Sequence, residues 1–160
     1  MVMETTALAG DASLFASYGR GSCNVNLFRL GLTRRIPWQS LERISKNLGL
    51  RAEIGYSFWN RSGDDIHVVA LTPVWFYGFE KRIWGGHPYI EGGIGVALLN
   101  DFVIGNRNLS SHFQFEDILG VGIDFGSMGI SLRFHHYSNA GIMEPNPGID
   151  LFLSNVHWRF

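Results

Sequence analysis

The chain is short of cysteine, of long apolar runs and of excess charge. Its one cysteine, Cys23, excludes an intrachain disulfide. No run of about 18 or more apolar residues is present, so a transmembrane helix is excluded, although a membrane barrel built from strands is not. A formal net charge of -1, with 17% charged residues, gives no basic field of the kind that binds nucleic acid.

The chain also has no internal repeat, low-complexity tract or linker that would divide it. Its 160 residues, 46% of them hydrophobic, suit a single domain covering 1–160. Residues 1–10 lack the charged region and apolar core of a complete signal peptide, although Ala7-Leu8-Ala9 resembles a cleavage site. We expect residues 1–10 to be a flexible or signal-derived N-terminus.

Alternating segments rich in aromatic and β-branched residues fill most of the chain, which predicts an all-β fold. Clusters of Gly, Asn, Ser and Pro separate these segments as turns, the longest polar one at 60–65. Only 37–47 suits a helical turn. The eight predicted strands are 11–20, 25–36, 48–59, 66–79, 87–99, 112–125, 128–138 and 150–160.

Within several predicted strands, apolar residues occupy one parity and polar or small residues the other. In 48–59 the polar or small positions are Arg51, Glu53, Gly55 and Ser57, and the apolar ones are Leu50, Ala52, Ile54, Tyr56 and Phe58. Two architectures fit this alternation. One is a soluble barrel with apolar residues inside, and the other is a membrane barrel with apolar residues outside.

Strand length and interior charge favour the membrane barrel. The segments approach the length that crosses a bilayer at a tilt of about 45°, whereas strands of soluble proteins more often have about five or six residues. Charges of both signs share the polar parity, where they can pair inside a narrow eight-stranded antiparallel barrel. They are Arg29, Arg51, Glu53, Glu91, Glu116, Asp124, Arg133 and Arg159. The terminal aromatic Phe160 resembles the C-terminal signature of bacterial outer-membrane barrels.

The last two predicted strands carry a candidate hydrolytic site. His136 and Ser138 are two residues apart, so in a strand their side chains leave the same face, which here is the apolar one. If the chain folds back symmetrically about Met143, Asp150 lies opposite His136. A His between a Ser and a carboxylate is the generic arrangement of base, nucleophile and orienting acid.

The parity of these three residues places the candidate site on the outside of the barrel, toward lipid. With both termini on the periplasmic side, the seventh and eighth strands join on the extracellular side. The site would then lie near the outer leaflet of the membrane. Its substrate should be a lipid that presents an ester at that interface.

These residues resemble a known family, the PagL family of lipid A 3-O-deacylases. The resemblance is carried by HHYSNAGI at 135–142 and EPNPGID at 144–150. It extends to PYIEGGIGVA at 88–97 and FEDILGVG at 115–122, and it covers most of the chain after about residue 45.

The resemblance implies an eight-stranded outer-membrane barrel that hydrolyses the ester at position 3 of lipid A and releases a 3-hydroxy fatty acid. It implies no metal and no organic cofactor. By position, His136 is the general base, Ser138 the nucleophile and Asp150 the orienting acid. The family pattern has Glu at this last position, so Asp150, one methylene shorter, requires closer strands or gives a weaker contact with His136.

The same mechanism needs hydrogen-bond donors for the oxyanion. The side chain of Asn139 and the backbone N–H of Gly141 are the nearest candidates, although Asn139 can equally serve only to stabilise the turn. Arg or Lys side chains near the barrel rim can meet the phosphates of lipid A. A homodimer is left open.

Three alternatives remain at this point. One is a non-catalytic outer-membrane barrel that serves as a structural or surface-interaction protein. Another is a soluble barrel with a ligand inside, which needs an apolar interior parity. Within the enzyme class, transfer of the acyl chain to another lipid rather than to water stays open, because the three residues do not fix the acceptor.

Overall fold

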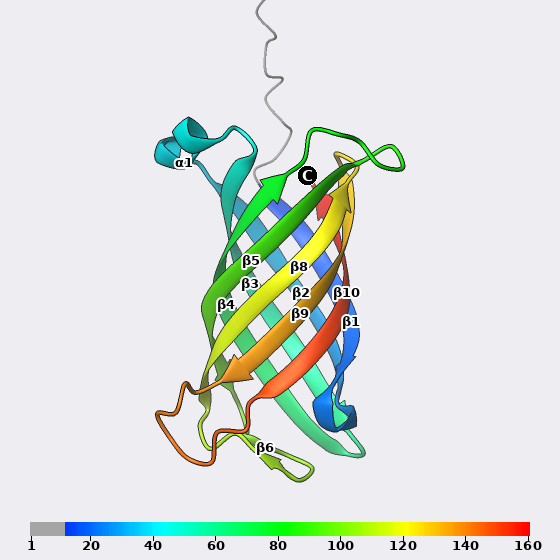
Figure 1. Cartoon of the computed structure of the whole chain (residues 1–160). Helices are drawn as coiled ribbons and strands as arrows, with labels where there is room; N and C mark the ends of the chain where they lie inside the picture. The colour runs from blue at the N-terminus through cyan, green and yellow to red at the C-terminus, as the bar shows by residue number, and fades with distance from the viewer. Residues whose placement is uncertain (1–11) are drawn as a thin grey trace, which may run out of the picture.

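The computed structural model describes residues 12–160, so the expectation for residues 1–10 lies outside it. The described chain closes into one antiparallel barrel in the order β1-β10-β9-β8-β5-β4-β3-β2 (Figure 1). The predicted eight-stranded barrel is confirmed. Its strands are β1 (Ala12–Gly21), β2 (Asn26–Ile36), β3 (Leu48–Arg61), β4 (Asp64–Gly78), β5 (His87–Leu99), β8 (Phe113–Asp124), β9 (Met128–Ser138) and β10 (Ile149–Arg159).

Short elements connect the strands. They are the 3-10 turn η1 (Ser22–Asn24), the helix α1 (Gln39–Ile44) and the hairpin of β6 (Val103–Ile104) with β7 (Arg107–Asn108). The helix confirms the turn expected in 37–47, whereas the β6–β7 hairpin was not predicted. Within residues 12–160, no helix is long and apolar enough to cross a membrane.

The predicted turn at 60–65 is wrong in its length. Residues Asn60 and Asp65 pair across β3 and β4, and Asn60 Nδ2 donates to Asp65 Oδ1 at 2.6 Å. Only Ser62 and Gly63 form the turn, both with positive φ, as a two-residue hairpin of this twist requires. Polar residues therefore continue the strand ladder here because they bond one another across it.

The outer surface of the barrel is apolar, and the charged side chains of the strands' polar parity face inward, as the parity predicted. Outward side chains such as Tyr18, Ile94, Leu119 and Phe152 are between 63% and 66% exposed, whereas inward Arg29, Glu53 and Glu116 are fully buried. An apolar band around a polar interior is the arrangement of barrels that stand in lipid. The soluble-barrel alternative needed apolar residues on the inward parity, and the inward Arg29, Glu53 and Glu116 contradict it.

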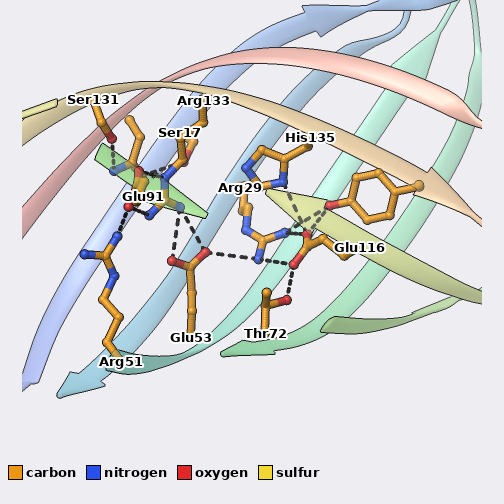
Figure 2. Close-up of polar contacts among 12 residues, drawn as sticks. Ser17, Arg29, Arg51, Glu53, Thr72, Glu91, Glu116, Ser131, Arg133 and His135 are labelled. Atoms are coloured by element: carbon orange, nitrogen blue, oxygen red, sulfur yellow. Dashed lines mark hydrogen bonds and ion pairs between the residues drawn. The ribbon is translucent and has the colours of Figure 1, made fainter. Parts of the chain in front are cut away.

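Ion pairs fill the middle of the barrel (Figure 2). Arg133 bridges Glu53 and Glu91 at 3.0 and 2.7 Å, and Arg51 also binds Glu91. Arg29 binds Glu53 at 3.2 Å and the carboxylate of Glu116. Gly120 leaves the space for this network, because a Cβ there would lie 2.7 Å from a Glu91 oxygen. The predicted pairing of interior charges is confirmed.

The two ends of the barrel differ. One end, at the top of Figure 1, carries α1 and the C-terminus, and we call it the terminal end. The opposite end carries η1, the β6–β7 hairpin and the β9–β10 loop at 139–148, and we call it the loop end. An apolar cluster fills the interior toward the loop end, where the rings of Trp59 and Tyr137 meet edge to face at 4.8 Å. Packed apolar side chains therefore fill the barrel interior beneath the loops of the loop end.

Candidate active site

His136 and Asp150 face each other across β9 and β10. They are directly opposed in the strand register, and His136 Nδ1 lies 2.6 Å from Asp150 Oδ1. Their side chains are 35% and 52% exposed, so both point out of the barrel. The pairing expected from symmetry about Met143 is present, and the shorter Asp side chain reaches the imidazole because the two strands are immediate neighbours.

Ser138 is the last residue of β9 and shares the outward face of His136. It lies opposite Phe115 of β8 and is partly exposed. Within residues 12–160, no residue forms a hydrogen bond with the Ser138 hydroxyl. Catalytic hydrogen bonds of free enzymes are often long and tighten only with substrate bound, so this geometry is compatible with a nucleophile beside its base.

The bond to Asp150 sets the chemistry of the His136 ring. An ionised carboxylate only accepts hydrogen bonds, so Nδ1 must carry the proton and donate. The other ring nitrogen, Nε2, is then the one with a free lone pair. It is this nitrogen that can take a proton from a hydroxyl.

Gly148 packs against the same ring from the β9–β10 loop. It has a φ of +58°, and a Cβ at this position would lie 2.7 Å from His136 Cε1 and 3.2 Å from Nε2. Glycine tolerates this backbone conformation and leaves room for the imidazole. The loop therefore fixes one edge of the ring. Composition alone marks Gly148 only as a turn residue, since its contact with His136 is long range.

Asn139 and Gly141, the expected oxyanion donors, are already hydrogen-bonded to other groups of the protein. The buried Asn139 side chain donates from Nδ2 to the carbonyls of Leu109 and Met143 at 3.1 and 2.9 Å. Its Oδ1 accepts from the Gly141 N–H at 2.9 Å. Asn139 thus shapes the loop in this structure.

Two residues of the connection between β5 and β8 brace the β9–β10 loop. Arg107 of β7 donates from Nη1 to the carbonyls of Pro147 and Gly148 at 3.0 and 2.6 Å. Ser110 Oγ donates to the Pro145 carbonyl at 2.8 Å. These supports were missed in the sequence, because a lone Arg or Ser in a polar loop gives no signal of its partner.

The surface around the site is apolar with few charges. The rings of Phe134 and Phe152 lie 5.2 Å apart, one row from His136 and Asp150 toward the terminal end. Arg20 of β1 is opposite Phe152 on the outer face and donates to Asn24 Oδ1 at 3.1 Å. Among residues 12–160, no group of three or more His, Cys, Asp or Glu side chains is arranged to hold a metal ion.

Comparison with known proteins gives consistent matches. The family model described as lipid A 3-O-deacylase (PagL) matches residues 26–159. Lipid A deacylase PagL of Pseudomonas aeruginosa is 33% identical in an alignment of 155 residues that covers 94% of this chain and 87% of that protein. Lipid A deacylase PagL of Bordetella bronchiseptica is 35% identical in an alignment of 119 residues that covers 71% of this chain and 64% of that protein.

Solved structures give the same result. The crystal structure of the outer membrane enzyme PagL is 30% identical, with a TM-score of 0.82 over 92% of this chain and 99% of that one. The N-terminal β-barrel domain of Pseudomonas aeruginosa OprF matches with a TM-score of 0.53 at 11% identity, over 95% of this chain and 98% of that one. The second match concerns the barrel fold alone.

Proposed function

The chain belongs to the PagL family of lipid A 3-O-deacylases, and from this membership we propose how its residues carry out the reaction. It is an outer-membrane ester hydrolase that acts on lipid A, as the sequence resemblance predicted. We assign Ser138 as the nucleophile, His136 as the general base and Asp150 as the orienting acid. The observation that supports this assignment is the 2.6 Å contact between His136 Nδ1 and Asp150 Oδ1, on the same outer face as Ser138.

In the first step, Ser138 Oγ attacks the carbonyl carbon of the ester at position 3, while His136 Nε2 takes the hydroxyl proton. The C–O bond to the sugar then breaks, and His136 returns the proton to the departing sugar oxygen. This leaves an acyl group on Ser138. Asp150 keeps the imidazole oriented and stabilises its transient positive charge.

In the second step, water attacks the acyl-enzyme. His136 Nε2 takes a proton from that water, and the tetrahedral intermediate collapses to a free fatty acid. The same proton returns to Ser138 Oγ, which regenerates the enzyme. The reaction needs no cofactor, because every proton moves between His136 and an oxygen.

The oxyanion of each tetrahedral intermediate needs donors about 2.7–3.1 Å away. The Asn139 amide and the Gly141 N–H stay our candidates. Since the Asn139 amide already donates to Leu109 and Met143, and the Gly141 N–H donates to Asn139 Oδ1, either donor must give up one of these bonds to reach the substrate. The loop would therefore change its hydrogen bonding when lipid A binds.

The outward direction of the site determines how substrate arrives. An ester in the outer leaflet meets Ser138 directly from the lipid, and the apolar surface at Phe134 and Phe152 can receive acyl chains. Arg20 is exposed on the neighbouring strand and can bind a lipid A phosphate. In this proposal the loop end faces the cell exterior, because both termini of an even-stranded outer-membrane barrel lie on the periplasmic side.

The reaction itself is tested by incubating the detergent-folded protein with lipid A and analysing both products by mass spectrometry. We expect lipid A that has lost one acyl chain from position 3, together with free fatty acid. If the chain reappears on a second lipid, the enzyme is an acyltransferase. If lipid A stays intact with the barrel folded, the non-catalytic barrel is the better account.

A further inference from the structure

A second carboxylate, Asp117, flanks His136 from the strand opposite to Asp150. It lies on β8 directly across from His136, and across from Ile94 on its other side. Its neighbours in sequence, Glu116 and Ile118, are buried inside the barrel, so Asp117 faces outward. One row of the outer surface therefore reads Asp150, His136 and Asp117 across three adjacent strands.

Asp117 has no partner of its own. Three carboxylates face outward from the described strands: Asp65 is bound to Asn60, Asp150 to His136, and Asp117 to nothing among residues 12–160. The imidazole of His136 turns toward Asp150 and Gly148 rather than toward β8. A carboxylate on a lipid-facing surface is costly unless a partner satisfies it, and such residues usually serve function.

The position of Asp117 fits a substrate contact. Ser138 lies opposite Phe115, two residues before Asp117 on the same face. Asp117 is thus a diagonal neighbour of Ser138, at a spacing of about 7–8 Å between such positions. An ester carbonyl at Ser138 would bring the groups on either side of that ester within reach of the Asp117 carboxylate.

We propose that Asp117 is a substrate-recognition residue whose carboxylate accepts a hydrogen bond from an O–H or N–H group of lipid A beside the scissile ester. This inference rests on the proposed function of the Ser138 site. The donor can be a hydroxyl on the departing acyl chain or the amide on the neighbouring sugar carbon. Either donor would satisfy Asp117 and hold the ester in register with Ser138.

The test compares three synthetic glucosamine esters with the same chain length. One carries both donors, one lacks the chain hydroxyl, and one has the amide N–H replaced by an ester oxygen. The ratio kcat/KM is measured for wild type, Asp117→Ala and Asp117→Asn. Val121→Ala, which truncates another outward residue of the same strand, is the matched control.

We expect wild type to lose about ten- to a hundredfold in kcat/KM when the recognised donor is removed, as for hydrogen bonds to charged groups. Asp117→Ala should lose a similar factor on the full substrate and little more on the substrate that already lacks this donor. The donor that Asp117 recognises is the one whose removal from the substrate lowers kcat/KM of wild type but lowers kcat/KM of Asp117→Ala little further. Asp117→Asn keeps an acceptor oxygen and should recover part of the loss.

An equal loss on all three substrates would overturn the proposal, because Asp117 would then act on the catalytic residues or on folding. No loss on any substrate would also overturn it. Binding of the same three esters to Ser138→Ala, with and without Asp117→Ala, is measured by native mass spectrometry. If wild type hydrolyses none of them, the proposed function fails, whereas donor-dependent binding would still support Asp117.

Discussion

Asp150 stands directly opposite His136 in the β9–β10 ladder, with 2.6 Å between its Oδ1 and the imidazole Nδ1. Both side chains face away from the barrel interior. The strand register itself therefore positions the two residues that we propose as acid and base, and the proposed nucleophile, Ser138, is the last residue of β9.

Replacement of Asp150 by Asn should lower kcat by about 10²- to 10⁴-fold, the upper figure being that of the equivalent change in a serine protease. The amide no longer holds the proton on Nδ1 or stabilises the imidazolium. Asp150→Glu keeps a carboxylate and should retain most of the activity. Initial rates on lipid A measure the effect, and Asp65→Asn is the control at the same end of the barrel. Full activity of Asp150→Asn would remove Asp150 from the mechanism.

Gly148→Ala should reduce activity about tenfold or more while the barrel still folds. The substitution strains a residue with φ of +58° by about 1–2 kcal/mol and pushes a methyl group against His136. Gly63→Ala is the matched control, since Gly63 has a φ of +101° but open space around it. Activity and heat-modifiable migration on gels are measured together. Equal activity of the two variants would show that the close contact between Gly148 and the His136 ring does not affect catalysis.

Arg107→Ala should lower kcat about tenfold, because loss of two hydrogen bonds from a charged donor frees the loop that carries Gly148. Hydrogen exchange should increase in 144–148, where the lost bonds end. Arg61→Ala is the control, since Arg61 bonds Asn106 and not this loop. If exchange and activity both match wild type, Arg107 does not position the site.

Arg133→Met should destabilise the barrel by about 3–5 kcal/mol, because it leaves two buried carboxylates without their shared partner. The effect concerns stability, since Arg133 lies in the interior and contacts none of the outward site residues. Urea unfolding from lipid vesicles, followed by tryptophan fluorescence, measures it. An unchanged unfolding free energy would contradict this account of the interior network.

The barrel could be read from the sequence because a membrane barrel imposes a strict alternation. Once Arg29 and Glu116 were assigned to the interior parity, the outward direction of His136 and Ser138 followed. The pairing of His136 with Asp150 also followed, because the numbers of paired residues in an antiparallel hairpin add up to a constant that the position of the turn sets. The position of the α1 helix was predicted from the absence of strand alternation in 37–47.

Contacts between distant loops could not be read in the same way. Arg107 and Pro147 are 40 residues apart, and no local pattern connects them. Asn139 was a candidate for catalysis, although its amide is bonded to Leu109 and Met143 in the folded chain. Asp117 shares the outward parity of Phe115 and Leu119, but the sequence does not show that its carboxylate lacks a partner, because that depends on the side chains that β5 and β9 place beside it.

The most direct test of the central claim is mass spectrometry of lipid A after incubation with wild type, Ser138→Ala and Ser154→Ala, all verified as folded. Ser154 is an outward serine of β10 away from the site. The account predicts that wild type and Ser154→Ala remove the acyl chain from position 3 and that Ser138→Ala leaves lipid A intact. Removal of that chain by Ser138→Ala at the wild-type rate would show that Ser138 is not the nucleophile.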